Sequence, residues 1–329
     1  RHEVDFGMAP VNEDKFPVLQ MDYADVKNGS EATFAEDGKT EDKNPRKKGL
    51  SFWLAAFFIV GEMAGSGVLI LPRALADAGW GGVVLLIFCC VNATYAGICL
   101  GRCWSILEER YEEYRTKNRY PYPAIAYRAA GMKMRYFVTV CLEINLLGVS
   151  IVFLLLSSEL IATLASTWGI SFCYWILIVA AVLCPLMWLG TPEDFWPAAV
   201  LAVGCTVTAC FLLIASIVKN AKETTIVPSY SPPSVLSFFL SFGTIFFSFG
   251  GAASFPTFQN DMEDKSQFPK AATTGFGILL LLYLPVAVLG YSVYGDSLKP
   301  DVINSLPDSG LKTAISILLA LHTMFAYLL

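Results

Sequence analysis

The stretch GEMAGSGVLILP (61–72) places a glutamate, a serine, closely spaced glycines and a proline inside the first long apolar segment of the chain. A second apolar segment contains a similar stretch, GTIFFSFGGAASFPTFQND (243–261). Gly67 precedes Pro72 by five residues, and Gly251 precedes Pro256 by five residues. Two such interrupted segments in corresponding positions predict two broken membrane helices that line a binding site. The alternative for each segment is tight helix packing, with a kink at the proline.

The composition predicts an all-α polytopic membrane protein. The chain has 329 residues, of which 55% are hydrophobic and only 16% are charged. Apolar runs recur, and each is long enough to cross a hydrocarbon layer of about 30 Å as a helix. The spans that we predict are 50–77, 81–104, 135–166, 170–190, 196–218, 235–260, 269–292 and 311–329.

These spans divide the chain into four parts. Residues 1–49 are polar and predict a disordered tail, and 50–218 hold the first five spans. An outer loop follows at 219–234, and 235–329 hold spans six to eight. Because the chain starts with Arg1 and stops inside an apolar run, we expect it to be part of a longer protein.

Basic residues predict the orientation. Arg46, Lys47 and Lys48 precede the first span, and the segment between spans two and three is also rich in Lys and Arg. Lys and Arg concentrate on the cytoplasmic side of membrane proteins. The N-terminus is therefore predicted to be cytoplasmic, and that segment (105–134) is predicted to form a cytoplasmic helix and a turn. Nothing in the sequence fixes the membrane, which is either the plasma membrane or that of a vesicle or lysosome.

A break in each of spans one and six predicts the chemistry of the bound molecule. Broken helices leave unpaired N–H groups at one side of the break and unpaired C=O groups at the other, which suit a carboxylate and an ammonium group respectively. A zwitterionic amino acid needs both. We assign carboxylate binding to the backbone of Gly65, Ser66 and Gly67. Ammonium binding falls to the carbonyls near Phe247, Ser248 and Phe249, with Gly250 and Gly251 allowing close approach.

Four motifs carry a family resemblance. GSGVLILPRALADAGW (65–80) resembles the first-helix signature of the amino acid/auxin permease family, which includes vesicular, proton-coupled and sodium-coupled amino acid transporters. YPYPAIAYRAAG (120–131), SFPTFQNDMEDKSQFPKA (254–271) and YGDSLKPDVINSLP (294–307) are similar to later motifs of that family, in the same order. The resemblance implies eleven helices in a five-plus-five inverted repeat with helices one and six broken. This chain holds eight of them, so its second repeat is incomplete. The resemblance also implies secondary active transport of amino acids, coupled to H⁺ or Na⁺.

Ionisable side chains inside spans are costly, and they are candidates for ion coupling. Glu62 lies one turn before the predicted break, where it either carries a proton or pairs with a neighbouring helix. His322 is the intramembrane histidine and either accepts the coupling proton or forms a buried hydrogen bond. The hydroxyl of Thr323 would suit Na⁺ instead. We favour H⁺, because Glu62 and His322 both lie in spans that the resemblance places at the centre of the fold.

Other function classes fit the sequence less well. A membrane enzyme would need a nucleophile–base pair or a metal cluster, and neither the motifs nor the spacing of the nine cysteines supplies one. A channel would need rings of polar residues. An amino-acid-sensing receptor on the same fold stays open. We therefore expect a transporter for small neutral amino acids in the lipid bilayer, with no cofactor other than the coupling ion, no metal and no nucleic-acid partner. Protein partners cannot be predicted.

Overall fold

The computed structural model describes residues 49–115, 120–187, 196–223 and 228–328, which all belong to one compact unit within 48–329. The predicted tail lies outside the described residues except for Gly49. The described part is helical, and its only extended pairing is an isolated bridge between Leu50 and Met262. Its α-helices are α2 (Phe52–Ala78), α3 (Gly81–Arg110), α4 (Pro121–Leu164), α5 (Phe172–Leu186), α6 (Trp196–Glu223), α7 (Val235–Phe247), α8 (Phe255–Asp261), α9 (Phe268–Tyr294) and α10 (Gly310–Leu328).

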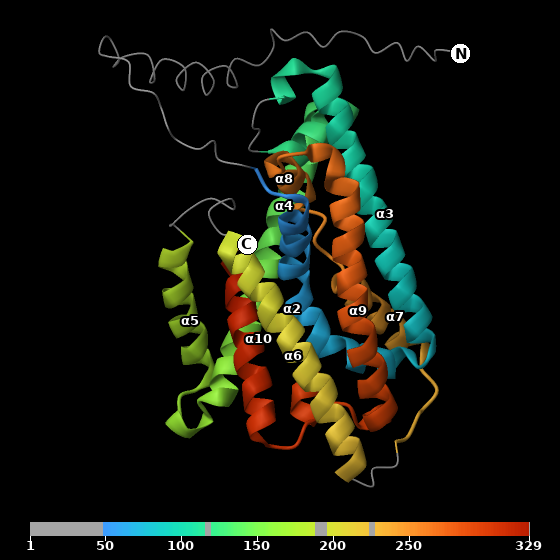
Figure 1. Cartoon of the computed structure of the whole chain (residues 1–329), viewed down its shortest axis with the longest axis vertical. Coiled ribbons are helices and arrows are strands. Elements are labelled where there is room, and N and C mark those ends of the chain that lie inside the picture. The colour runs from blue at the N-terminus through green and yellow to red at the C-terminus, as the bar shows by residue number, and fades with distance from the viewer. Residues whose placement is uncertain (1–48, 116–119, 188–195, 224–227, 329) are drawn as a thin grey trace. The chain divides into compact units, whose positions relative to one another are not determined.

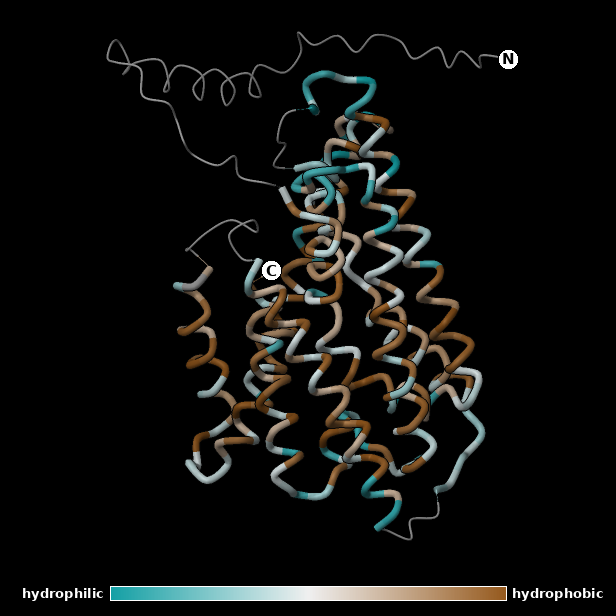
Figure 2. The backbone as a smooth tube through the Cα atoms, viewed as in Figure 1, coloured by the Kyte–Doolittle hydropathy of each residue, from teal (hydrophilic) through white to brown (hydrophobic). Residues whose placement is uncertain are grey.

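Six helical stretches of the described residues are long and apolar enough to cross a membrane, and they include α2, α3, α4, α6, α9 and α10. The helices α5 and α7 are apolar but shorter. Figure 2 shows the hydrophobic residues running along the helices, with hydrophilic residues gathered toward their ends. The α-helices overlap the predicted spans, although α4 already begins at Pro121 and its backbone is kinked at Ala130 and Gly131, before the predicted start at 135. The overlap supports the prediction of a polytopic helical protein.

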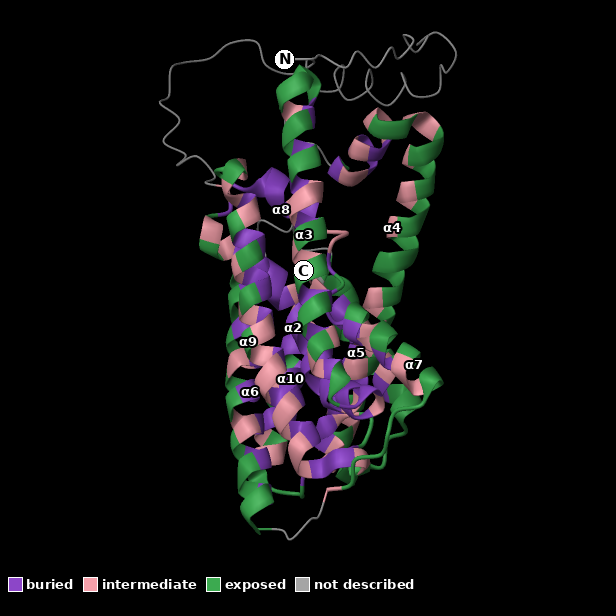
Figure 3. Ribbon diagram, turned by 90° about the vertical axis from the view of Figure 1, so that its right-hand side faces the viewer, coloured by how far each residue is buried: buried purple, intermediate pink, exposed green. Residues whose placement is uncertain are grey.

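The helix α2 is the centre of the packing (Figures 1 and 3). It contacts α6, α7, α9 and α10, and most of its residues are buried. A helix that is apolar and buried on all sides belongs in the middle of a bundle rather than against lipid. The helix α10 packs against α4 and α6 on one side of α2, while α3 and α9 pack together on another.

The predicted break in the first span is wrong. The helix α2 is continuous from Phe52 to Ala78, and it runs through Gly65, Gly67 and Pro72. These glycines provide close approach instead: a Cβ on Gly65 would collide with the ring of His322, and a Cβ on Gly67 would lie 2.5 Å from the Tyr283 hydroxyl. The alternative, tight packing, is therefore the correct description of this segment.

The predicted break in the sixth span is confirmed. The helix α7 ends at Phe247, α8 begins at Phe255, and the residues between them are not α-helical. Consecutive glycines at 250 and 251 disfavour a helix by about 1 kcal/mol each relative to alanine. Pro256 lies in the first turn of α8, where its missing N–H costs nothing. Pro72 in α2, by contrast, lies inside a helix.

One end of the bundle, which we call the Met262 end, joins the start of α2 to the end of α8. The Leu50 N–H donates to the Asp261 carbonyl at 2.8 Å, and the Glu263 N–H donates to the Leu50 carbonyl at 3.0 Å. Lys265 forms an ion pair with Glu108 of α3 at 2.5 Å. The start of α2 and the end of α3 thus lie at the same end, as expected for a helical hairpin.

The opposite end, which we call the Asp296 end, contains the connection from α9 to α10. Asp301 accepts a hydrogen bond from the Ile303 N–H at 2.9 Å and caps a short 3₁₀ helix, Val302–Ser305. The pKa of Asp301 is raised to about 6, mainly by burial and also by the charge of Glu159 on α4, against the opposing effects of the capping bond and of Lys312 on α10. Because the pKa is raised above that of the unfolded chain, this carboxyl stabilises the fold at acidic pH and loses that contribution as the pH rises through 6.

Asp301→Asn is expected to increase the stability at neutral pH. Asparagine caps helices as well as aspartate does, but it has no charge to bury, so the gain should be about 1–3 kcal/mol. Thermal unfolding of the purified protein in detergent, at about pH 5 and about pH 7.5, measures it. The control is Asp308→Asn, because Lys312 lowers the pKa of the exposed Asp308. A gain of equal size in both variants would contradict the explanation.

Candidate functional site

The interrupted segment 248–254 lies against the middle of α2. Ser248 and Phe249 are buried at its start, with 1% and 2% of their surfaces exposed. The Tyr283 hydroxyl on α9 donates to the Met63 carbonyl of α2 at 2.6 Å and lies 3.2 Å from the Ser248 carbonyl. A Cβ on Gly251 would lie 2.9 Å from the Met63 sulfur. The break and the α2 turn around Met63 are therefore in direct contact.

Glu62 contacts the far end of the same segment. Its Oε1 accepts a hydrogen bond from the Ser254 hydroxyl at 2.7 Å. Its Oε2 is buried and has no hydrogen-bond partner among the described residues. Burying a charged carboxylate oxygen that accepts no hydrogen bond costs free energy. The arrangement is suited to a carboxyl group that holds a proton on Oε2.

His322 lies on another side of α2. Its Nδ1 lies 3.0 Å from the Ala202 carbonyl and 2.6 Å from the Thr206 hydroxyl, both on α6. Because a carbonyl can only accept, we assign the Nδ1–H tautomer. The Nε2 atom then carries a lone pair; it is buried, faces Gly65, and has no partner among the described residues. Nε2 is the atom of this ring that could take up a proton.

The Thr323 hydroxyl faces away from α2. It receives a hydrogen bond from Ser157 of α4 at 2.8 Å and donates to the Ala320 carbonyl at 3.0 Å. Its methyl group, instead, is the part that faces Gly65. Nor do the described residues contain a group of His, Cys, Asp or Glu side chains that could hold a metal ion.

The structure brings most of the sequence-predicted residues to one level of α2. Glu62 meets the break, Gly65 meets His322, and Gly67 meets the Tyr283 ring, with Ser66 buried between the glycines. Phe247 is different, because 41% of its surface is exposed and its carbonyl already accepts from the Gly250 N–H. The N–H groups of Gly65, Ser66 and Gly67 belong to a continuous helix, so the free donors predicted there are not present.

Sequence reasoning missed Tyr283, Ser254 and Thr206, which are among the side chains that contact the predicted residues. The signal for Tyr283 was a lone hydroxyl in the apolar run ILLLLYLP. Ser254 and Thr206 carried no such signal, because single hydroxyl residues are common in membrane helices and usually bond to their own backbone.

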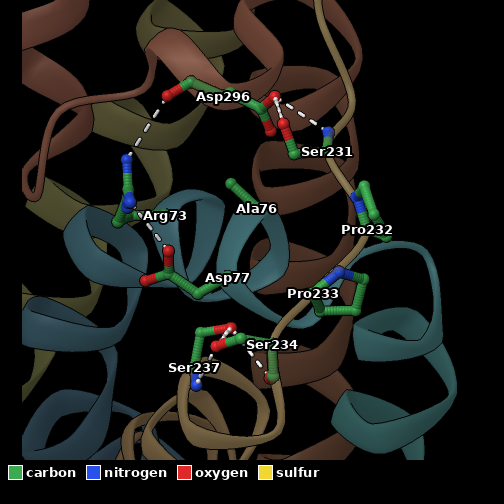
Figure 4. Close-up of a pocket in the computed structure, with 9 residues that line it drawn as sticks. All are labelled: Arg73, Ala76, Asp77, Ser231, Pro232, Pro233, Ser234, Ser237 and Asp296. Atoms are coloured by element: carbon green, nitrogen blue, oxygen red, sulfur yellow. Dashed lines mark hydrogen bonds and ion pairs between the residues drawn. The ribbon is translucent and has the colours of Figure 1, made fainter.

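A separate pocket of about 230 Å³ opens at the Asp296 end (Figure 4). Arg73 and Asp77 of α2, Asp296, and the serines before and within α7 line it. Its charges satisfy one another: Arg73 pairs with Asp77 at 2.7 Å and donates to the Leu298 carbonyl at 2.6 Å, and Asp296 accepts from Ser231. None of the predicted site residues lines this pocket. The interactions of its lining residues connect α2 to two loops.

A bundle of apolar helices around a buried central helix, with one span interrupted beside it, defines an integral multi-pass membrane protein. Residues 48–329 match the model of the family described as transmembrane amino acid transporter protein. Since this match covers most of the chain, the chain belongs to that family. The family and the relatives below are transporters, not enzymes.

Three relatives from Arabidopsis thaliana illustrate the match. The chain is 27% identical to amino acid transporter AVT1J over 293 residues, which cover 86% of this chain and 66% of the relative. It is 26% identical to AVT1C, covering 83% and 49%, and 24% identical to amino acid transporter ANT1, covering 82% and 62%. The chain thus spans from about half to two thirds of the length of these relatives.

Proposed function

We propose that the protein is a secondary transporter of small neutral amino acids, and that the substrate binds beside the segment 248–254, where this segment meets the α2 turn that carries Glu62 and Met63. The observation that carries the proposal is the interruption of a membrane span directly against the buried central helix. Irregular backbone at membrane depth is tolerated where it lines a cavity or is buried in protein. Family membership supports amino acids as the substrates.

Recognition of the amino group falls to the carbonyls at the end of α7. The last carbonyls of a helix lack intrahelical partners and carry a partial negative charge. The Ser248 carbonyl is one of these groups, and Gly250 and Gly251 leave the backbone beside it without side chains. An ammonium group has three donors to offer such acceptors. The side chain of the substrate is then recognised by other residues near the site.

We propose H⁺ as the coupling ion, with Glu62 and His322 as its carriers. Each has one buried atom without a partner among the described residues, Oε2 in Glu62 and Nε2 in His322. A coupling proton can occupy either atom without displacing an existing hydrogen bond. The alternative, Na⁺, needs several oxygen ligands facing one point, and the Thr323 hydroxyl is engaged with Ser157 and Ala320 instead.

The topology of the proposal places the Met262 end in the cytoplasm. The basic residues before α2 and between α3 and α4 support this orientation. We also propose that the helices follow the inverted-repeat arrangement, with the interruption confined to the second repeat. The packing of α2 with α3, and the ring contacts of Phe255 in α8 with Phe268 and Phe276 in α9, are compatible with it.

Counterflow in proteoliposomes tests the proposal without assuming a coupling ion. The whole protein is reconstituted in vesicles loaded with unlabelled neutral amino acids, and labelled amino acid is added outside. A transporter takes up label in exchange for the internal pool, whereas vesicles without internal amino acid take up far less. Binding of the label without exchange would overturn the proposal and favour an amino-acid-sensing receptor on the same fold.

A further inference from the structure

The Tyr283 hydroxyl connects two backbone carbonyls that belong to different parts of the proposed site. One is Met63 on α2, at 2.6 Å, and the other is Ser248 at the end of α7, at 3.2 Å. Tyr283 itself lies on α9 and has none of its surface exposed. Three elements that are far apart in the sequence thus meet at one oxygen atom.

Because of the break, the Ser248 carbonyl needs a hydrogen-bond donor from outside its own helix. Were the sixth span continuous, the Ser248 carbonyl would accept an N–H from the next turn, but α7 ends before that turn forms. A buried carbonyl without a donor costs about 1–3 kcal/mol. The phenol offers a single O–H, and it lies within hydrogen-bonding distance of both the orphaned carbonyl and Met63.

Packing on both faces fixes the position of the hydroxyl. Gly67 of α2 leaves room for the ring, because a Cβ there would lie 2.5 Å from both Cζ and the hydroxyl oxygen. The Phe249 ring lies on the break side, with its centroid 5.5 Å from that of Tyr283. A ring held between α2 and the break cannot turn away without disturbing both.

We infer that Tyr283 is a positioning residue of the amino acid site: it holds the start of the segment 248–254 at a fixed distance from α2, so that the carbonyls at the end of α7 stay aimed at the substrate amino group. The inference rests on the proposed function. Because Tyr283 acts on the backbone that reads the amino group, its loss should affect amino acids with different side chains equally.

Tyr283→Phe tests the inference, because it removes the hydroxyl and keeps the ring. We expect the KM for uptake to rise about three- to tenfold, the equivalent of one hydrogen bond. The rise should be the same for a small and a large neutral amino acid, and Vmax per folded protein should stay within about twofold of wild type. Tyr291→Phe is the matched control. It lies two turns further along α9 and is equally buried, but its ring packs against Trp80 and Tyr230, away from the break.

The outcomes separate the inference from the proposed function. If the wild-type protein takes up amino acids and the Tyr283→Phe variant does so with the same KM, the inference is overturned and the proposed function stands. A lower Vmax and a lower melting temperature at unchanged KM would also overturn it, since that is the result of a purely structural role. A wild-type protein that neither binds nor carries amino acids would overturn the proposed function and this inference together.

Discussion

Glu62→Gln is expected to abolish the accumulation of amino acids driven by a pH gradient, while exchange of internal for external amino acid continues. Glutamine keeps an oxygen that can accept the Ser254 hydrogen bond, so the contact between α2 and the break survives. It cannot bind or release a proton, however. A carboxyl group inside a membrane helix costs about 2.5–3.5 kcal/mol, and loss of coupling is the expected result if that group carries the driving ion.

The measurement compares labelled amino acid uptake with and without an inward proton gradient, together with counterflow on the same vesicles. Glu159→Gln is the control, because this residue of α4 is exposed and its charge acts on Asp301 at the Asp296 end. The account predicts wild-type accumulation in the control and simple equilibration in Glu62→Gln. Full gradient-driven accumulation by Glu62→Gln would remove Glu62 from the mechanism and leave His322 as the remaining candidate.

Gly67→Leu is expected to reduce uptake at least about tenfold. The new Cβ would lie 2.5 Å from the Tyr283 hydroxyl, and the rest of the leucine side chain would extend beyond it. Overpacking of a buried contact costs about 1–3 kcal/mol. Displacing the ring also breaks its hydrogen bonds to Met63 and Ser248, so the break loses its attachment to α2.

Uptake per folded protein is the readout, with the amount of folded protein measured by size-exclusion chromatography in detergent. Gly277→Leu on α9 is the matched control, since a Cβ at Gly277 has no atom within 4 Å. It should behave as wild type. If Gly67→Leu transported amino acids with unchanged apparent affinity, the close approach of Tyr283 to α2 would not matter for transport.

The spans could be predicted from the sequence because an apolar run of membrane length has few alternatives. The breaks could be predicted only in part. Gly67 and Gly251 stand at equal distances from their prolines, yet one lies in a continuous helix and the other in a gap. A glycine has no Cβ, and this suits close packing and a broken helix equally well. The two glycines differ in their neighbours. Gly67 packs against the Tyr283 ring, whereas Gly251 lies in a run of consecutive small residues.

The candidate site shows the same limit. Glu62 and His322 could be identified because charged and titratable groups are rare inside spans. The direction in which the Thr323 hydroxyl faces depends on Ser157, 166 positions away, and Tyr283 meets carbonyls that are 220 and 35 positions away. No pattern within one span encodes such contacts.

Uptake of a labelled neutral amino acid into proteoliposomes under an imposed inward proton gradient tests the central claim most directly. It is measured with and without Na⁺ and with and without a proton ionophore. The account predicts accumulation that is indifferent to Na⁺ and is abolished by the ionophore. Accumulation that requires Na⁺ and persists with the ionophore, or binding without any uptake, would contradict it.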